Sequence, residues 1–542
     1  MKKQNFVEGA IILMIANLLV KVFGAIFKIP LTNIIGVEAM AYFNTAYGFY
    51  VIFYMISTAG LPVAVSKLIS AAETQKNKKE VEKIFKISYA LFFSFGLSAM
   101  ILMVIFASNY ASYVKLQGLE WAIFALSPTI FFICLTSAYR GYFQGLKNMT
   151  PTAVSQVTEA IGKLVIGLIF AFYASKNGYS SHIVAAFSLI GVTVGAVLST
   201  AILKVYKFIY KPVYDKNPQS VSTSKHIIKN LISIAIPITL SATIMSLTNT
   251  IDTTFMVQRL INSGVQQEAA TKIMGAYTSM AVPLFNLPPN LIYPFAISII
   301  PALTSSCTAG KIKESFSTMT STFRIATIIS TPCALGLSAL SFPIISLLYK
   351  NNEIISLDGS SEPLTAIAVA SPLLSVLSIS IFFLASISVT NAILQAFGYE
   401  SKTIISTVVG IVAKVILTYV LIGHDKISMF GAPISTLACY FIIMCLNFYF
   451  VVKYTGYMPS IRKIFMKPII ASVISIAIGA VVHTYYLSEH LGNKSVILSI
   501  LLSSFLYFTI LFIIKGIEKE DLLLLPRGNA VVNFLNKAKL LK

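Results

Sequence analysis

Charged residues are scarce in this sequence: Asp, Glu, Lys and Arg make up 11 % of its 542 residues, whereas 56 % are hydrophobic. A soluble protein of this length would not bury so much apolar side chain. The apolar runs are mostly long enough for a helix to cross the hydrocarbon core of a bilayer, and the short alternating segments of an outer-membrane barrel are absent. The sequence therefore predicts an all-α polytopic membrane protein.

Residue types that carry catalytic or metal chemistry are also rare. The five cysteines form no C-x-x-C pair and the five histidines are scattered, which argues against a metal site. The motif G-x-x-x-x-G-K-[ST] is absent, so any energy-requiring step must draw on an ion gradient, the membrane potential or a solute gradient instead of a P-loop nucleotide site. The acidic residues expected near the outer face (Asp252, Asp358, Asp425) are far apart and lack a partnered histidine. We therefore expect no catalytic residues, no enzyme activity and no cofactor.

Hydropathy predicts fourteen membrane spans, with edges accurate to a few residues. The ranges are 7–30, 40–66, 85–107, 121–146, 152–174, 182–205, 227–250, 274–302, 316–349, 364–397, 402–422, 429–452, 467–487 and 495–515. Most of the 41 Lys and Arg fall in loops on the side of the N-terminus. This asymmetry places both termini in the cytoplasm, and it explains the net charge of +21 without a nucleic-acid partner.

Part of the chain repeats. Three residue pairs share one offset: Gln144 and Gln395, Ser155 and Ser406, Lys163 and Lys414. We interpret the repeat as two parallel, pseudo-symmetric six-helix lobes with a cavity between them. The expected domains are an N-lobe (1–205), a cytoplasmic linker (206–226), a C-lobe (227–453), two further C-terminal helices (454–516) and a cytoplasmic tail (517–542).

Charged and polar residues inside the spans form the candidate substrate site. Lys21, Lys163 and Lys414 are the three cations that we expect well inside spans, where an unpartnered charge is costly. The predicted cavity lining consists of Asn17, Lys21, Lys28, Asn286 and Lys414, whose cations would attract an anion. For the lysines, snorkelling to the membrane interface is the structural alternative.

Four further residues are expected to serve structure or coupling. Glu159 and Lys163 are four apart on one helix, which predicts an ion pair between them. Arg140 closes the fourth span, and we expect it to meet headgroup phosphates or a helix end. Asp252 has oxygen-bearing neighbours that suggest a sodium site, with an exposed helix end as the alternative.

The eighth span is rich in proline, which no straight helix tolerates. Its prolines are Pro283, Pro288, Pro289, Pro294 and Pro301. Broken backbone at membrane depth is allowed only against protein or a water-filled space. The sequence therefore predicts a hinge-like segment over 274–302.

Two stretches resemble a known family. The segments GLPVAVSKLIS (60–70) and RGYFQGLKNMTPTAVSQVTE (140–159) resemble the polysaccharide-transporter branch of the MOP superfamily, in particular the MurJ-type lipid II flippases and the stage V sporulation protein B group. The resemblance implies a MATE/MOP-like fold of fourteen spans, with the last two forming a lipid-facing groove. Lys21 matches a basic position that the family uses at its central cavity, whereas Phe27 stands where Gram-negative members carry a second basic residue.

The expected function is therefore a flippase that moves a polyprenyl-diphosphate-linked sugar, such as lipid II or a spore-cortex precursor, across the cytoplasmic membrane by alternating access. Its expected partners are this lipid-linked oligosaccharide and membrane lipids, with cell-wall synthesis proteins as further candidates. A cation-coupled multidrug exporter, an exporter of teichoic or capsular polysaccharide precursors, and a non-transporting scaffold for wall or spore-coat assembly remain as alternatives.

Overall fold

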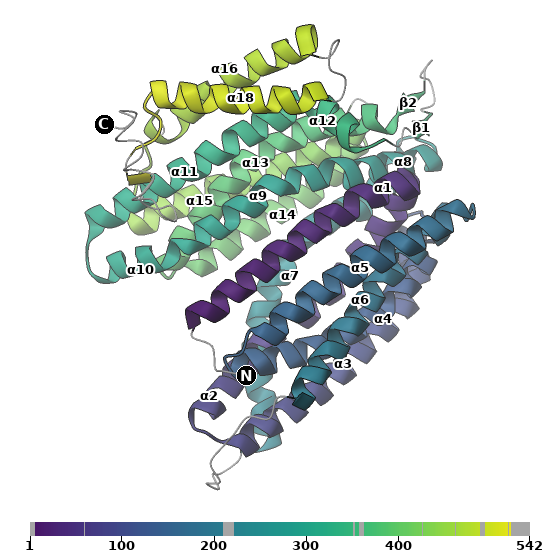
Figure 1. Ribbon diagram of the computed structural model, residues 1–542, viewed down its shortest axis with the longest axis vertical. Coiled ribbons are helices and arrows are strands. Elements are labelled where there is room, and N and C mark those ends of the chain that lie inside the picture. The colour runs from purple at the N-terminus through teal and green to yellow at the C-terminus, as the bar shows by residue number, and fades with distance from the viewer. Residues whose placement is uncertain are drawn as a thin grey trace. The chain divides into compact units, whose positions relative to one another are not determined.

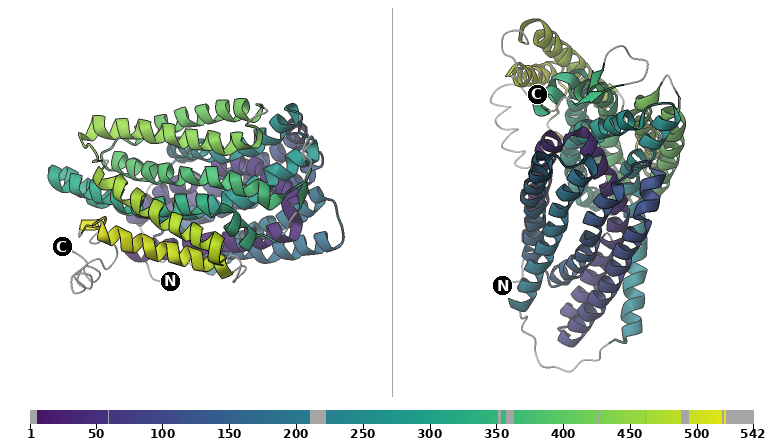
Figure 2. Two further views of the ribbon diagram at one scale, coloured as in Figure 1. Left: turned by 90° about the horizontal axis from the view of Figure 1, so that it is seen from above. Right: turned by 90° about the vertical axis from the view of Figure 1, so that its right-hand side faces the viewer.

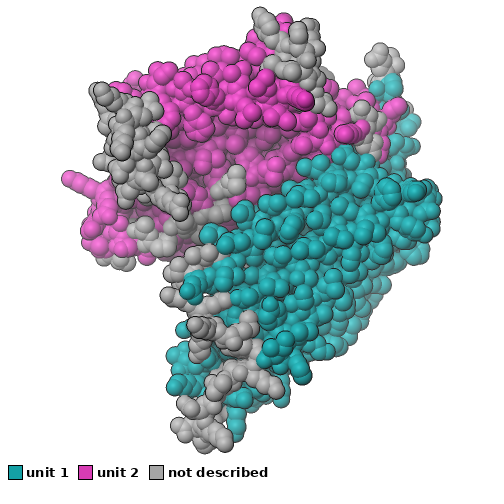
Figure 3. All heavy atoms as spheres, viewed as in Figure 1, with its two compact units in different colours: residues 1–279, 355–363 teal, residues 280–354, 364–542 magenta. Residues whose placement is uncertain are grey.

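The computed structural model describes residues 6–58, 60–209, 222–350, 353–356, 363–424, 427–460, 462–487, 494–518 and 520–521. The chain divides into two compact units, coloured separately in Figure 3: unit 1 holds residues 1–279 and 355–363, and unit 2 holds residues 280–354 and 364–542. The boundary between residues 279 and 280 lies inside a π-helical segment, Tyr277–Ala281. The two six-helix lobes and the linker predicted from the sequence repeat have other boundaries than these compact units. The arrangement in two symmetric lobes therefore stays a prediction.

Unit 1 is helical throughout its described part up to the π-helical segment. Its helices are α1 (Phe6–Thr58), α2 (Leu61–Thr74), α3 (Lys78–Tyr113), α4 (Leu119–Gly145), α5 (Thr150–Lys176), α6 (Ser181–Ile209), α7 (Ser224–Asn262) and α8 (Gln267–Ala276), shown in purple to teal in Figures 1 and 2. α1 bends at Gly36, whose φ of 79° is a left-handed conformation that favours glycine. α1 therefore contains all of the predicted span 7–30 and most of the predicted span 40–66, joined through the kink.

α4 is the central helix of unit 1 and packs against α1, α2, α3 and α6. Two threonine pairs join it to α6, with hydroxyl oxygens 2.7 Å apart for Thr129 and Thr193 and 2.8 Å apart for Thr136 and Thr200. The two contacts lie two helical turns apart on each helix, so they fix the register of the pair. In a bilayer, hydrogen bonds of this kind associate helices whose apolar surfaces gain little from leaving lipid.

α5 and α6 lie side by side (Figure 1) and approach closely because glycines face each other. A Cβ atom added at Gly162 would lie 2.7 Å from the Cα of Gly195, a distance that real Cβ atoms do not reach. The neighbouring backbone would therefore have to move to accommodate a side chain.

We expect Gly162→Ala to lower the free energy of unfolding by about 1–3 kcal/mol, the usual cost of overpacking a tight interface. Thermal unfolding of the purified protein in detergent measures the change. Ile161→Ala is the matched control, because the adjacent Ile161 side chain is exposed on the same helix. Equal unfolding midpoints for Gly162→Ala and Ile161→Ala would contradict the close α5–α6 packing.

Unit 2 is also helical, apart from one short ribbon in its described part. Its elements are α9 (Val282–Ser298), α10 (Ile300–Thr308), α11 (Ile312–Ala339), α12 (Ser341–Leu348), β1 (Ile354–Ile355), β2 (Leu364–Thr365), α13 (Ala366–Ala396), α14 (Glu400–Ile422), α15 (Gly431–Thr455), α16 (Lys467–Val482) and α18 (Lys494–Ile513), with β1 extending one residue into unit 1. Shorter segments are the 3-10 turn Ser428–Phe430 and the π-helical Arg462–Met466 and His483–Leu487. α13 is central and packs against α9, α11 and α15, and α16 and α18 lie side by side (Figures 1 and 2).

The proline-rich range breaks as the sequence predicts. Instead of one helix over 274–302, the chain forms α8, the π-helical segment, α9 and α10, with a turn at residue 299. The segment that contains the break also contains the boundary between the compact units. Its mobility stays a prediction.

Eleven helices in the described part of the chain are long and apolar enough to cross a membrane. They include α1 as one helix and omit α7 and the broken α8–α9 region. Because α1 covers two predicted spans, these three regions account for the difference from the fourteen expected. The protein is thus an all-helical polytopic membrane protein, and the full count of fourteen crossings stays a prediction.

Candidate functional site

A row of aromatic and cationic side chains follows one face of α1. The Lys28 ammonium donates a 3.1 Å hydrogen bond to the carbonyl oxygen of Thr278 in the π-helical segment. The amide of Asn44, further along α1, donates to the hydroxyl of the same threonine at 3.1 Å. Lys28 is thus anchored to the π-helical segment of unit 1.

Lys163 of α5 lies over two rings of this face. Its Nζ is 5.0 Å from the ring centre of Phe27 and 4.8 Å from that of Tyr47. Both distances suit a cation–π contact, which partly compensates an ammonium that has left bulk water. Phe27 adjoins Lys28 in sequence, and the two ammonium groups are close enough to repel each other.

Arg140 and Glu159 form an ion pair, with 2.8 Å between Nη2 and Oε2. The guanidinium also donates to the hydroxyl oxygens of Ser155, at 3.0 Å, and Ser199, at 3.3 Å. The expected Glu159–Lys163 pair is therefore wrong, because the Glu159 carboxylate is taken by Arg140 and the Lys163 ammonium lies over aromatic rings. Arg140 is mostly buried and joins α4, α5 and α6, and its expected contact with headgroup phosphates or a helix end stays a prediction.

We call Lys28, Lys163, Glu159 and Arg140 the polar column: Lys163 packs on Phe27, the neighbour of Lys28, and Glu159, four residues before Lys163 on α5, pairs with Arg140. Tyr47 connects it to further tyrosines of α1, since the ring centres of Tyr47 and Tyr50 are 5.5 Å apart and those of Tyr50 and Tyr54 are 5.6 Å apart. Three basic side chains and one carboxylate make the column basic overall. In a low-dielectric interior such a basic column attracts an anion.

Lys21 and Asn17 lie at exposed positions on α1, and the nearby Leu18 and Val22 are also exposed. The structure does not bring Lys21 into the polar column. Their predicted contact with a substrate stays a prediction.

Asp252 is buried within α7, which continues to Asn262. The exposed helix end considered from the sequence is therefore wrong. The Tyr277 hydroxyl donates to the Asp252 carboxylate across 3.5 Å, and the Thr253 hydroxyl donates to the Thr250 carbonyl at 2.9 Å. Among the described residues no group of three or more His, Cys, Asp or Glu side chains is placed to hold a metal ion.

The remaining predicted site residues belong to unit 2. Lys414 of α14 is almost completely buried, and Asn286 of α9 is partly buried. The position equivalent to Arg140 in the repeat is Asn391, whose side-chain oxygen accepts a 2.8 Å hydrogen bond from Asn447 of α15. Arg140 and Asn391 are thus each hydrogen-bonded to a later helix of their own unit. The repeated sequence alone does not show which helix that is.

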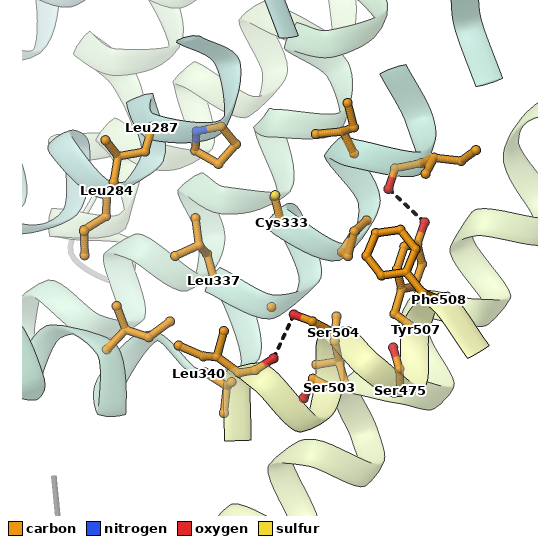
Figure 4. Close-up of a pocket in the computed structure, with 18 of the residues that line it drawn as sticks. Leu284, Leu287, Cys333, Leu337, Leu340, Ser475, Ser503, Ser504, Tyr507 and Phe508 are labelled. Carbon is orange, nitrogen blue, oxygen red and sulfur yellow. Dashed lines mark hydrogen bonds between the residues drawn. The ribbon is translucent and has the colours of Figure 1, made fainter. Parts of the chain in front are cut away.

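Unit 2 contains an apolar pocket of about 620 Å³, the C-terminal pocket, shown in Figure 4. It lies among α9, α11, α12, α16 and α18, so the last two long helices contribute one wall. Leu284, Leu337 and Phe508 are typical of its lining, and Cys333 is its only thiol among the described residues. The Tyr507 hydroxyl is satisfied by the Ile328 carbonyl at 2.8 Å, and the lining is mainly apolar apart from Ser475, Ser503, Ser504 and Asp521.

Sequence reasoning missed one buried cation. Arg324 of α11 is 3 % exposed and bonds Glu518 at 2.6 Å and Asp521 at 3.2 Å. The signal was present, since Arg324 falls inside the predicted span 316–349 as Lys163 falls inside its own. Its partners, however, lie beyond the last span, and no local pattern connects them to α11.

Comparison with known proteins identifies the protein family that this chain matches. The model of the family described as polysaccharide biosynthesis protein matches residues 6–306. Among Bacillus subtilis (strain 168) proteins, the chain is 24 % identical to the lipid II flippase MurJ over 88 % of each chain. It is also 24 % identical to the stage V sporulation protein B, over 97 % of this chain and 98 % of that protein.

Solved structures share the fold. A structure of the lipid II flippase MurJ in an inward closed conformation superimposes with a TM-score of 0.68 at 17 % identity, covering 93 % of this chain and 98 % of the other. An inward-facing multidrug resistance MATE family transporter of the MOP superfamily gives 0.67 at 15 % identity, covering 81 % and 94 %. The chain therefore has a MATE/MurJ-like fold, and its relatives include a lipid II flippase and a multidrug transporter, which are transporters and not enzymes.

Proposed function

This chain belongs to the polysaccharide biosynthesis protein family, and we propose that it is a flippase for a polyprenyl-diphosphate-linked sugar. It is a multi-pass membrane transporter of the MOP superfamily, related to the lipid II flippase and to the stage V sporulation protein B. Beyond this family membership, we propose the substrate class, a location of the protein in the cytoplasmic membrane, and an orientation with both termini in the cytoplasm.

The polar column is the observation that carries the proposal. A lipid-linked sugar has an anionic diphosphate that cannot cross hydrocarbon unaided, because desolvating an unpaired charge costs many kcal/mol. The excess positive charge around Lys28 and Lys163 would offset that cost. An exporter of cationic drugs would need the opposite sign in this interior, so the column argues against that alternative.

The C-terminal pocket supports a lipid rather than a water-soluble substrate. Its lining is mainly apolar, and α16 and α18 supply one wall, as the family resemblance leads us to expect for a groove that holds a prenyl chain. We propose that the chain of the substrate occupies this pocket while its diphosphate is handled by cationic side chains.

Transport requires the polar groups to be exposed to each side of the membrane in turn. The break around the π-helical segment, where the compact units divide, is the proposed hinge. A carrier site with excess positive charge that moves in the membrane field would couple to the potential by about 2.3 kcal/mol per charge per 100 mV. A sodium ion at Asp252 is an alternative coupling site, held by its carboxylate.

Complementation of a bacterial strain depleted of its lipid II flippase tests the proposed function. We expect the wild-type chain to restore growth and wall synthesis. Failure to restore growth, with normal amounts of protein in the membrane, would indicate that the substrate is another polyprenyl-linked precursor. Strains depleted of the exporter of teichoic or capsular polysaccharide precursors would then identify it. Failure in all of these strains would contradict the proposal.

Cys333 reports on occupancy of the C-terminal pocket. In a variant that keeps Cys333 as its single cysteine, we expect a polyprenyl phosphate to slow alkylation by a membrane-permeable maleimide about 10-fold, because the bound chain excludes the reagent. A second variant that keeps only Cys445, which is exposed outside this pocket, is the matched control. Equal protection of both thiols, or of neither, would show that the lipid does not enter the pocket.

A further inference from the structure

The C-terminal pocket ends at a charged cluster formed by the buried Arg324 and Asp521 and the half-exposed Glu518. Asp521 lines the pocket, as does Ile325, the neighbour of Arg324 in α11. Arg324 itself is 3 % exposed and does not line the pocket. Asp521 is 1 % exposed and contacts both the pocket and the guanidinium. Moving the Asp521 side chain away would therefore open the guanidinium to the apolar pocket.

The bonding of Arg324 is incomplete. One nitrogen, Nη1, makes both ion pairs, at 2.6 Å to Glu518 Oε2 and 3.2 Å to Asp521 Oδ2. The Nε–H is buried and has no acceptor. An arginine that serves structure alone would use its planar fork in two parallel bonds, and a buried donor left unpaired costs about 1–3 kcal/mol. The Nε–H of Arg324 can donate to one more anionic oxygen.

The two carboxylates come from the segment that follows α18. Asp521 Oδ2 also accepts a 2.8 Å hydrogen bond from the Glu518 backbone N–H, so the two acids are held as one turn. Burial raises the pKa of the Asp521 carboxyl, against the opposing effects of the Glu518 N–H and of Arg324. Burial thus disfavours the ionised form of the Asp521 carboxylate at this position.

Resting on the proposed function, we propose that Arg324 is a second phosphate-binding residue, at the end of the prenyl-chain pocket, and that Glu518 and Asp521 occupy its site as an internal substitute for a diphosphate. Two linked carboxylates on one guanidinium copy the charge arrangement of two linked phosphates. A polyprenyl diphosphate that fills the pocket would displace the Glu518 and Asp521 carboxylates and bind Arg324, including its Nε–H. The two carboxylates then compete with the substrate for the guanidinium.

The test measures binding of farnesyl diphosphate to the full-length protein in detergent, by native mass spectrometry or ligand-induced thermal shift. Farnesol, which lacks phosphate, and inorganic pyrophosphate, which lacks the chain, are the comparison ligands. We expect the double variant Glu518→Gln, Asp521→Asn to bind farnesyl diphosphate about 10-fold more tightly than wild type, with farnesol unchanged. A tighter binding of pyrophosphate alone would assign the site to free phosphate and overturn the lipid proposal.

Arg324→Gln on its own leaves the buried Asp521 carboxylate without its cation and could fail to fold. The triple variant Arg324→Gln, Glu518→Gln, Asp521→Asn removes all three charges and avoids that problem. We expect it to lose the 10-fold gain of the double variant. Unchanged or weaker binding in the double variant, or a gain that persists in the triple variant, would overturn the inference.

The result separates the inference from the proposed function. If wild type and every variant bind neither farnesyl diphosphate nor farnesol, the prenyl substrate itself is wrong. If all of them bind farnesyl diphosphate with the same affinity, the proposed substrate stands and the role of Arg324 falls.

Discussion

Lys21→Ala is expected to slow transport of the lipid-linked substrate about 10- to 100-fold, because a charge-assisted hydrogen bond to phosphate contributes about 1.5–3 kcal/mol. Lys21 is exposed on α1, so its truncation should leave the unfolding midpoint unchanged. That separation of activity from stability is what makes Lys21 more informative than Lys28, whose ammonium also holds the π-helical segment through Thr278. Transport is measured on protein reconstituted into liposomes.

Two control variants accompany Lys21→Ala. Lys21→Arg keeps the charge and should retain most of the activity, whereas Lys204→Ala removes an exposed lysine near the end of α6 and should have no effect. Wild-type rates for Lys21→Ala would show that this lysine only snorkels to the interface. A lowered unfolding midpoint for Lys21→Ala would assign it a structural role instead.

Arg140→Ala should be the most destabilising single substitution in the polar column. It leaves the Glu159 carboxylate without its partner and removes the contacts to Ser155 and Ser199. Breaking a fully buried pair costs about 3–5 kcal/mol, and we expect about 2–3 kcal/mol here because the Glu159 side chain is still 27 % exposed. The measurement is the change in unfolding free energy in detergent.

Glu159→Gln should cost less than Arg140→Ala, since the arginine keeps two serine partners and an amide oxygen can still accept its hydrogen bond. The double variant Arg140→Ala, Glu159→Gln should recover part of the loss, because it contains no unpaired carboxylate. Strictly additive effects would mean that the two charges do not interact, contrary to the 2.8 Å contact.

The fold was largely predictable from sequence because a bilayer permits few solutions. Helices must satisfy their own backbone, so long apolar runs and the proline-rich range 274–302 indicated both the spans and the break. The kink that joins two predicted spans into α1 depends on a single glycine, Gly36, and hydropathy does not detect it.

The site was less predictable, since its contacts join distant helices. The sequence suggested Lys163, four residues away, as the partner of Glu159. The Glu159 carboxylate instead pairs with Arg140, whose guanidinium is held nearby by two serine hydroxyls. Lys163 is instead placed by aromatic rings of α1, more than 100 residues earlier in the chain. A spacing rule describes one helix and contains no information about which neighbour packs against it.

Transbilayer movement of a fluorescent polyprenyl-diphosphate sugar in liposomes that contain the purified protein tests the central claim most directly. The account predicts rapid movement with wild type, slow movement with Lys21→Ala, and intermediate or normal movement with Lys21→Arg. Equal rates for liposomes with and without the wild-type protein, tested with several sugar headgroups and with a membrane potential applied, would contradict it.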